Sequence, residues 1–217
     1  MKIAFIGTGK VGAPLAIRLA AAGHQVVLAQ PTDAPQSVDA ALGRSQHLVA
    51  QPIQQAVASA EIVFLATPFA ANEAVLRQVA PELAGKVLVD CTNPVGPNLS
   101  HGLASQQSGS EFVASLVPQT KVVKAFTIYG FENLEDSAFP GFGVRPAMLF
   151  CGNDREAKQQ VAPLIADCGF EPVDAGELSR ALHLEHMTLL WIKMVRLDGQ
   201  SPHFVFGALR KPQGTQT

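Results

Sequence analysis

The chain has 217 residues, of which 47% are hydrophobic and 16% charged, and its 16 basic and 18 acidic side chains leave a net charge of −2. This balance excludes the basic surface expected of a nucleic-acid-binding protein. No run approaches the ~18 apolar residues that span a bilayer, and the opening MKIAFIG leaves no room for a signal peptide. Three scattered cysteines, Cys91, Cys151 and Cys168, favour neither a disulfide framework nor a zinc site. We therefore expect a cytoplasmic protein with neither a nucleic-acid nor a membrane partner.

Short β-branched runs alternate with helical patterns along the chain, which is typical of a mostly parallel sheet covered by helices. Helices are expected from about Val11 to Gly23, from a capping box of Asn153 and Glu156 to about Cys168, and over 177–197. The fold class is thus α/β, a Rossmann doubly wound sheet over 1–145 with a small C-terminal α/β extension over 146–217. The predicted strands are 2–6, 25–29, 47–50, 62–66, 87–90, 121–126, 147–151 and 171–174.

A glycine motif follows the first predicted strand and opens the first predicted helix, the context that a dinucleotide fingerprint requires. Gly7 allows a tight turn, Gly9 lets a pyrophosphate approach the backbone, and Gly12 permits close packing of helix on strand. The helix N-terminus would supply N–H donors to the phosphates. A glycine-rich turn without a ligand is the alternative. The basic excess of residues 1–60 also suits an anionic cofactor. The motif reads Gly7-Thr8-Gly9-Lys10-Val11-Gly12, and the basic residues are Lys2, Lys10, Arg18 and Arg44 against Asp33 and Asp39.

The residues after three other strands indicate how the cofactor would lie. After the second strand an acid favours NAD and an arginine favours NADP, but the chain has Gln30 and Thr32 there, which can donate hydrogen bonds to a phosphate without requiring one. These residues alone therefore leave both NADP and NAD open as the cofactor. Thr67-Pro68 and Asn93-Pro94 follow the fourth and fifth strands, against the expected nicotinamide, although turn chemistry explains such residues equally well.

No catalytic acid–base pair is identified in the sequence. Tyr129 is followed by Asn133 rather than by the lysine of a Tyr-x-x-x-Lys pair. His183 and His186 stand three residues apart on a predicted helix, but a surface or core-edge pair explains them better than a metal site, so no metal is predicted. Hydride transfer between two ring cofactors requires mainly that the rings be positioned. The catalytic residues stay unassigned, and cofactor-to-cofactor chemistry is favoured.

Several blocks in order resemble the coenzyme F420-dependent NADP oxidoreductases, which are related to the reductase domains of membrane ferric reductases. These blocks are IGTGKVGAPLAIRLAAAGHQVVL, VFLATPF, VDCTNPV, SEFVASLVPQTKVVKAF, CGNDREAKQQVAPLIADCGFEPVDAGEL and ALHLEHMTLLWI. The resemblance implies hydride transfer between NADPH and a deazaflavin held between two domains, and a homodimer. Carried over by position, it implies that Thr8, Gly9, Lys10 and Val11 hold the pyrophosphate, that Ala66, Thr67, Pro68 and Asn93 line the nicotinamide, and that Ala125, Phe126 and the loop from Thr127 face the second ring.

Two departures from the family pattern bear on the cofactor and on the acceptor. Gln30-Pro31 stands where the family usually has Ser-Arg, and Thr127 replaces an asparagine. The loop that follows, YGFENLEDSAFPGFG, is rich in phenylalanine. Two interpretations of this loop stay open: it binds an altered substrate or a flavin in place of a deazaflavin, or it forms only a hydrophobic lid or a dimer contact. The leading hypothesis is an NADP(H)-dependent oxidoreductase that passes hydride to a small-molecule acceptor, coenzyme F420 or a flavin. The alternatives are a reductase of a small carbonyl or imine, and an NADP(H)-sensing module without catalysis.

Overall fold

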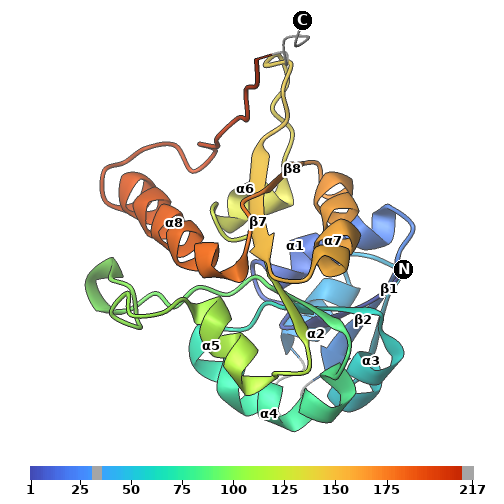
Figure 1. Cartoon of the computed structure of the whole chain (residues 1–217). Coiled ribbons are helices and arrows are strands. Elements are labelled where there is room, and N and C mark those ends of the chain that lie inside the picture. Colours follow the sequence, from blue (N-terminus) through green and yellow to red (C-terminus); the bar gives the residue numbers. More distant parts are fainter. Residues whose placement is uncertain (31–35, 212–217) are drawn as a thin grey trace, which may run out of the picture.

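The computed structural model describes residues 1–30 and 36–211, and within these residues eight strands form one sheet in the order β3-β2-β1-β4-β5-β6-β7-β8 (Figure 1). Strands β1 to β6 pair in parallel, β7 joins β6 antiparallel, and β8 returns parallel to β7. All eight predicted strands are confirmed, and their ends shift by two residues or fewer. The strands are β1 Lys2–Ile6, β2 Gln25–Gln30, β3 Leu48–Pro52, β4 Ile62–Leu65, β5 Val87–Asp90, β6 Lys121–Lys124, β7 Ala147–Gly152 and β8 Glu171–Asp174.

Helices cover the central strands, which explains why β4 and β5 are buried at every position and show no alternation. Helices α3, α4 and α5 pack in one row, while α1 contacts α6 and α7. None of the described helices is long and apolar enough to cross a membrane. The helices are α1 Gly12–Ala21, α2 Gln36–Leu42, α3 Ile53–Ser59, α4 Asn72–Leu83, α5 Gly109–Leu116, α6 Phe131–Glu135, α7 Arg155–Asp167 and α8 Ala181–Arg196.

The predicted capping box at Asn153 is wrong by one residue. Asp154 is the N-cap of α7, because its carboxylate accepts a hydrogen bond from the Ala157 N–H at 2.8 Å. The Asn153 side chain instead accepts from the N–H of Leu178, 2.9 Å away in the turn before α8. The last helix likewise starts later than expected, at Ala181, after a 3₁₀ turn over Leu178–Arg180.

The loop expected after Thr127 contains a short helix that lies against α1. Helix α6 has five residues, too few to be stable alone. The guanidinium of Arg18 on α1 donates to the carbonyls of Leu134 and Glu135 at 2.8 and 2.6 Å, which satisfies the end of α6. The first part of the phenylalanine-rich loop is therefore fixed to the helix that follows the glycine motif.

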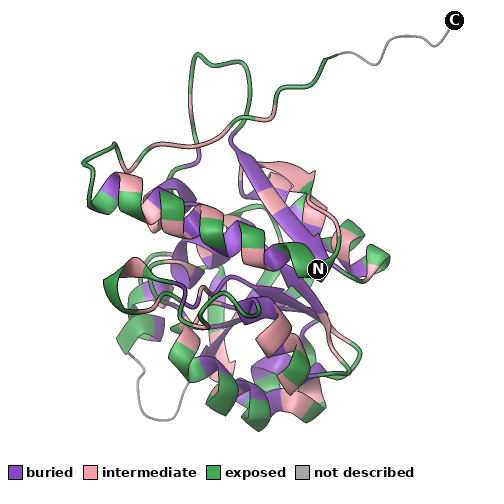
Figure 2. Ribbon diagram, turned by 60° about the vertical axis from the view of Figure 1, so that its left-hand side comes forward, coloured by how far each residue is buried: buried purple, intermediate pink, exposed green. Residues whose placement is uncertain are grey.

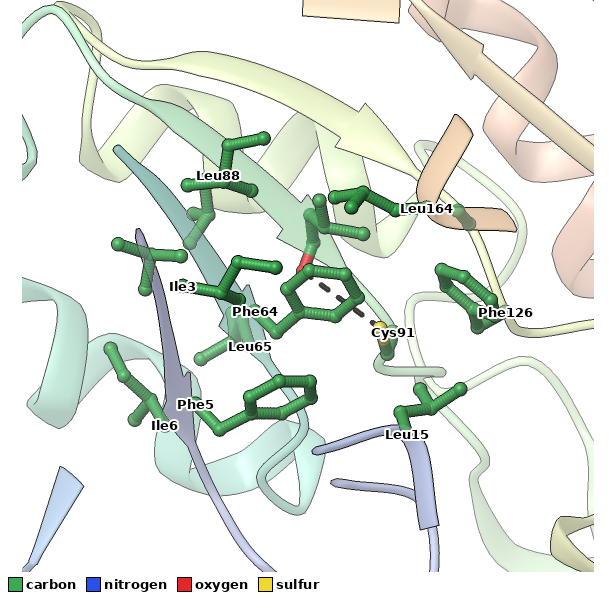
Figure 3. Packing of buried hydrophobic residues seen from close by; sticks show 14 of the residues in the cluster. Ile3, Phe5, Ile6, Leu15, Phe64, Leu65, Leu88, Cys91, Phe126 and Leu164 are labelled. Atoms are coloured by element: carbon green, nitrogen blue, oxygen red, sulfur yellow. Dashed lines mark hydrogen bonds between the residues drawn. The ribbon is translucent and has the colours of Figure 1, made fainter. Parts of the chain in front are cut away.

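The hydrophobic core runs through the sheet, where Figure 2 shows buried residues concentrated in the strands. The rings of Phe5 and Phe64 stack with centroids 4.5 Å apart, and Phe64 meets Phe126 at 5.8 Å (Figure 3). Phe126 follows β6 and is 1% exposed. The core thus reaches the carboxyl edge of the parallel strands, where ligands of open α/β sheets bind.

Candidate functional site

The fingerprint turn has the steric properties that its glycines predict. Gly7 has φ +97°, and a Cβ added there would lie 2.6 Å from the carbonyl of Ala66. A Cβ on Gly12 would lie 2.0 Å from the Gly7 oxygen, whereas one on Gly9 would meet no atom within 4 Å. Two glycines are therefore required by packing, and the backbone at the third is open to a ligand.

Helix α1 begins at this turn without a side-chain cap. Val11 occupies the N-cap position and has no side chain that could accept a capping hydrogen bond, and the first turn contains no acidic residue. The N–H groups of such a helix end and its positive partial charge favour an anion. A pyrophosphate fits this helix end because it would supply the missing acceptors.

A cavity of about 260 Å³ opens where the fingerprint turn, the ends of β5 and β6, and helices α6 and α8 meet. Two polar atoms in its wall, Asn93 Oδ1 and Thr127 Oγ1, are buried and have no hydrogen-bond partner. A buried polar atom without a partner is costly, so these atoms fit a ligand that supplies donors. The lining residues are Val11, Cys91, Asn93, Val95, Phe126, Thr127, Tyr129, Gly130, Phe131, Thr188, Trp191, Ile192 and Arg196.

The structure brings most of the predicted site residues to this edge of the sheet. Ala66 lies against Gly7, and the Thr67 hydroxyl donates to Asn72 Oδ1 at 2.7 Å, so its side chain already has a structural partner. Phe126 has a left-handed φ of +59°, unusual for a residue with a side chain. In the same region Ala125 and Pro94 are buried, whereas Pro68 is exposed.

The ribose side of the predicted site is only partly described. Gln30 ends β2 and is exposed, and Thr32 lies outside the described residues. The buried hydroxyl of Thr8 is 2.9 Å from that of Ser37, at the start of α2. Between Arg18 and Arg44 the sequence has no lysine or arginine. Hydroxyl and amide groups, rather than a cation, are thus the polar groups that this segment offers.

Most of the basic side chains that give residues 1–60 their positive charge do not lie beside the cavity. Arg18 binds the end of α6, and Arg44 pairs with Glu135 at 3.4 Å. Lys10 alone of these lies beside the cavity, with its Nζ 4.6 Å from the centre of the Phe131 ring. Arg196 adds a second cation to the cavity wall and pairs with Glu132 at 2.5 Å.

The second half of the phenylalanine-rich loop belongs to a different surface. In Figure 1 the loop that leads into β7 rises beyond the sheet together with the segment that follows α8. Phe139, Phe142 and residues 203–207 line an apolar groove of about 280 Å³ there, and Phe142 is 73% exposed. Phe131 therefore serves the cavity, while the later phenylalanines line a separate groove.

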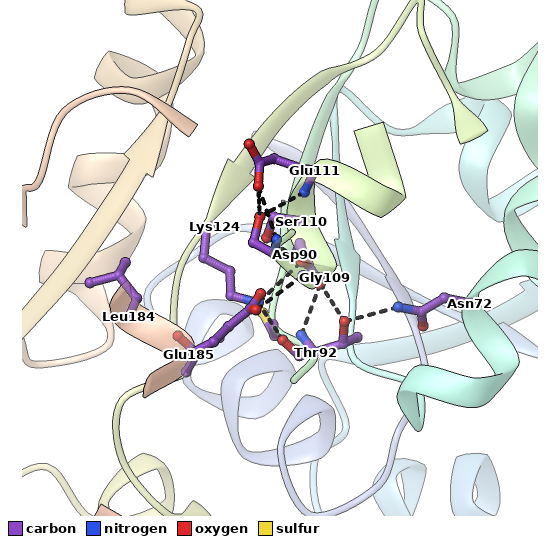
Figure 4. A network of polar contacts seen from close by, with 12 residues as sticks. Asn72, Asp90, Thr92, Gly109, Ser110, Glu111, Lys124, Leu184 and Glu185 are labelled. Atoms are coloured by element: carbon purple, nitrogen blue, oxygen red, sulfur yellow. Dashed lines mark hydrogen bonds and ion pairs between the residues drawn. The ribbon is translucent and has the colours of Figure 1, made fainter. Parts of the chain in front are cut away.

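A buried cluster of charges that was not predicted from the sequence lies beside the cavity (Figure 4). Lys124 Nζ lies 3.3 Å from Asp90 Oδ2 and 3.0 Å from Glu185 Oε1, with all three side chains at most 1% exposed. Burial lowers the pKa of Lys124, but Asp90 and Glu185 outweigh burial and raise that pKa above 10.5. The cluster could have been predicted from Lys124, because a lysine inside a strand that is covered on both faces needs a buried partner of opposite charge.

Hydrogen bonds extend this cluster in two directions. Glu185 Oε2 accepts from the Gly109 N–H at 3.0 Å and from His101 Nε2 at 2.8 Å. His101 Nδ1 accepts from the N–H groups of Leu103 and Ser105, which assigns the ring proton to Nε2. Toward the nicotinamide side, Thr92 Oγ1 donates to Asp90 Oδ1 at 2.7 Å. The cluster thus links β5, β6, α5 and α8.

The histidine pair on α8 is a surface feature, as predicted. His183 and His186 are both exposed, and His186 Nε2 lies 3.0 Å from the Ser105 hydroxyl. The described part of the chain contains no group of three or more His, Cys, Asp or Glu placed to hold a metal.

The chain is similar in sequence and in fold to known and putative F420-dependent NADP reductases. The family described as NADP oxidoreductase, coenzyme F420-dependent, matches residues 2–94. The F420-dependent NADP reductase of Methanothermobacter marburgensis is 30% identical over 89% of this chain and 92% of its own length. A crystal structure of a putative F420-dependent NADP reductase from Arthrobacter sp. FB24 is 29% identical and superposes with a TM-score of 0.85, covering 97% of this chain and all of that one.

A second group of relatives is longer. The rat metalloreductase STEAP3 is 34% identical over 188 residues, which are 87% of this chain and 36% of that protein. This chain thus spans about a third of the length of the metalloreductases that it matches. The full-length similarity to the reductases decides the assignment: the chain belongs to the family of coenzyme F420-dependent NADP oxidoreductases.

Proposed function

We propose that the protein transfers hydride between the nicotinamide of NADP(H) and a flat flavin-type acceptor, a deazaflavin or a flavin, that binds in the cavity beside α8. The observation that carries this proposal is the continuity of the fingerprint turn with the cavity through Val11. A dinucleotide on the open backbone at Gly9 would lead into a space whose wall holds the unpartnered Asn93 and Thr127. Membership of a family of NADP oxidoreductases supports the cofactor.

The residues of the chain act mainly by positioning. The fingerprint turn and the N-terminus of α1 would hold the pyrophosphate, and Ala66, Thr67, Pro68, Asn93 and Pro94 would stand on the nicotinamide side. Phe126 and Trp191 offer apolar surface to the acceptor. When bound, the nicotinamide supplies the hydride, and the acceptor takes it together with one proton from solvent. Such transfer requires donor and acceptor carbons about 3–3.5 Å apart.

The titratable groups in the cavity wall do not offer an acid at neutral pH. Burial raises the pKa of the Cys91 thiol well above 9, and burial raises the pKa of Tyr129 to about 12. The Tyr129 hydroxyl also donates to the carbonyl of Ala147 at 2.6 Å, so its proton is engaged in a hydrogen bond within the protein. This environment favours reactions that need aligned rings rather than a strong acid.

The two cations beside the cavity favour an acceptor with an anionic substituent. Lys10 Nζ lies 4.6 Å from the centre of the Phe131 ring, and Arg196 Cζ lies 5.5 Å from the centre of the Trp191 ring. A phosphate or carboxylate on the acceptor would gain charge-assisted hydrogen bonds there. Both FMN and coenzyme F420 carry such groups, whereas riboflavin does not.

Stopped-flow mixing with NADPH and, in turn, coenzyme F420, FMN, FAD and riboflavin tests the proposal. We expect single-turnover reduction of at least one anionic acceptor, well above the rate without protein, and slower reduction of riboflavin. In Lys10→Gln the advantage of FMN over riboflavin is expected to fall severalfold. Reduction of none of the four acceptors would refute the proposal. A cyclic imine and an α-keto acid as further arms distinguish the alternative of a small carbonyl or imine reductase.

A further inference from the structure

Three successive pairs join the segment that begins in β6 to helix α8, and the partners in each pair are 61 residues apart. The pairs are Lys124 with Glu185, Thr127 with Thr188, and Gly130 with Trp191. Each step advances three residues on both segments, close to one turn of α8. We call these three pairs the register ladder.

Each pair of the ladder makes a different kind of contact. Lys124 Nζ and Glu185 Oε1 form a fully buried ion pair at 3.0 Å. The Thr188 hydroxyl donates to the Thr127 carbonyl at 2.7 Å, which is closer than the Leu184 carbonyl of its own helix at 3.0 Å. A Cβ added to Gly130 would lie 2.3 Å from Trp191 Cη2, so only glycine fits against the indole. The ion pair, the hydrogen bond and the steric restriction at Gly130 thus all fit the same alignment of α8 with the segment that begins in β6.

Two of the three pairs of the ladder form one side of the cavity. Thr127, Gly130, Thr188 and Trp191 all line it, and Phe126, with its left-handed backbone, lies between the first two pairs. A shift of α8 along its axis would change the position of the Trp191 indole against Phe126. The Trp191 Nε1–H also donates to the Phe204 carbonyl at 2.8 Å, which holds the indole from its other end.

We infer that the register ladder is a positioning device, which sets the separation between the two walls of the acceptor half of the cavity. Thr188 is its central positioning residue. The inference rests on the proposed hydride transfer, because the acceptor ring must lie at a fixed distance from the nicotinamide. A misplacement of about 1 Å can lower the rate by about 10²-fold, so small shifts of α8 are expected to matter.

Thr188→Val removes the central hydrogen bond with little change in volume, and Thr188→Ser restores the hydroxyl. Thr120→Val is the matched control, because its hydroxyl donates to the Leu83 carbonyl at 3.1 Å before β6, at the opposite end of that strand. The measurements are the NADPH dissociation constant, the single-turnover rate of acceptor reduction, and acrylamide quenching of Trp191. Trp191 is the only tryptophan of the chain, so its fluorescence reports on this wall without any reaction.

We expect Thr188→Val to lower the rate about tenfold or more and to raise Trp191 quenching, while NADPH affinity stays within about twofold. Thr188→Ser should recover most of the rate, and Thr120→Val should match the wild type in rate and quenching. Gly130→Ala should also change Trp191 emission, because its added Cβ meets the indole.

Two results with Thr188→Val alone would each overturn the inference. One is a Thr188→Val protein with the rate and quenching of the Thr120→Val control. The other is a Thr188→Val protein that loses NADPH affinity and rate together, since that describes a general loss of structure. If the wild type reduces no acceptor, the proposed function fails. The ladder is refuted separately if acrylamide quenches Trp191 equally in the wild type, Thr188→Val and Gly130→Ala.

Discussion

The carbonyl oxygen of Gly7 lies where a side chain on Gly12 would begin, only 2.0 Å from the position of an added Cβ. We expect Gly12→Ala to destabilise the fold by about 1–3 kcal/mol, as overpacking does, and to disturb the fingerprint turn. Gly9→Ala meets no such obstacle, so its melting temperature should stay near that of the wild type. Its NADPH affinity should nevertheless fall about tenfold or more, because the methyl group occupies the approach to the backbone.

Thermal unfolding and calorimetric titration of the two variants provide the check. Gly9→Ala with wild-type NADPH affinity would show that the pyrophosphate does not approach the backbone at this glycine.

The unpartnered hydroxyl of Thr127 predicts opposite effects on stability and on activity. A buried hydroxyl without a partner costs about 1–3 kcal/mol, so Thr127→Val should leave the free energy of unfolding unchanged or raise it. Acceptor reduction should slow, because the group that a ligand would satisfy is gone. Thr127→Ser keeps the hydroxyl and is the control. Denaturant unfolding and acceptor KM measure the two effects, and a Val variant that is both less stable and fully active would contradict the prediction.

The coupling free energy between Lys124 and Glu185 is expected to be far larger than that of an ion pair on the surface. Lys124→Met leaves Asp90 and Glu185 buried without their cation and should cost about 3–5 kcal/mol. In Glu185→Gln the new amide must point its NH₂ at Lys124 or at the N–H groups of Gly109 and His101, so this variant should also be less stable.

A double-mutant cycle by urea unfolding measures the coupling between the two positions. We expect the free energy of unfolding to fall clearly less in the double variant than the two single variants' decreases would add up to. The exposed pair Arg77 and Glu73, one turn apart on α4, is the matched comparison and should couple by less than about 1 kcal/mol. Additive losses at Lys124 and Glu185 would argue against the interaction.

The buried thiols predict how stability depends on alkaline pH. Burial raises the pKa of Cys151 and of Cys168 from 9.0 to about 12. The folded protein therefore holds these protons more tightly than the unfolded chain does, so their contribution is present below pH 9 and is lost as the pH rises toward 12. We expect the melting temperature to fall above pH 9, and to fall less steeply in Cys151→Ala. The same burial predicts slow reaction of native thiols with Ellman's reagent, and fast reaction after unfolding.

The absence of a cation between Arg18 and Arg44 predicts a weak preference for NADP over NAD. Neutral donors such as the Thr8 and Ser37 hydroxyls bind a 2′-phosphate less strongly than an arginine does. Paired calorimetric titrations should give dissociation constants that differ by less than about tenfold, a difference of about 1.4 kcal/mol. Ser37→Ala should reduce the difference further. A preference of several hundredfold would place a stronger phosphate site elsewhere in the chain.

The strands were predictable because their signal is local. Runs such as IVFL in β4 are apolar throughout, and burial on both faces requires that composition. The sequence predicts the N-cap of α7 one residue too early, because Asn153 and Asp154 are both good caps. The contact that decides between them comes from Leu178, 25 residues away.

The same contrast between local and distant contacts holds at the candidate site. The fingerprint is six consecutive residues between a strand and a helix, so the sequence identifies it. The charge cluster joins Asp90 to Lys124 across 34 residues and His101 to Glu185 across 84, and no local pattern records such pairs. The boundary near residue 145 and the homodimer stay predictions.

The two hydrogen bonds from Arg18 to α6 also constrain the order of folding. They join residues 116 and 117 positions apart, and a five-residue helix cannot persist before its partner is in place. We therefore expect helix α6 to form after α1 has docked on the sheet, and the Phe131 side of the cavity to be completed late. Conditions that loosen α1 would release this wall first, well before the central strands separate.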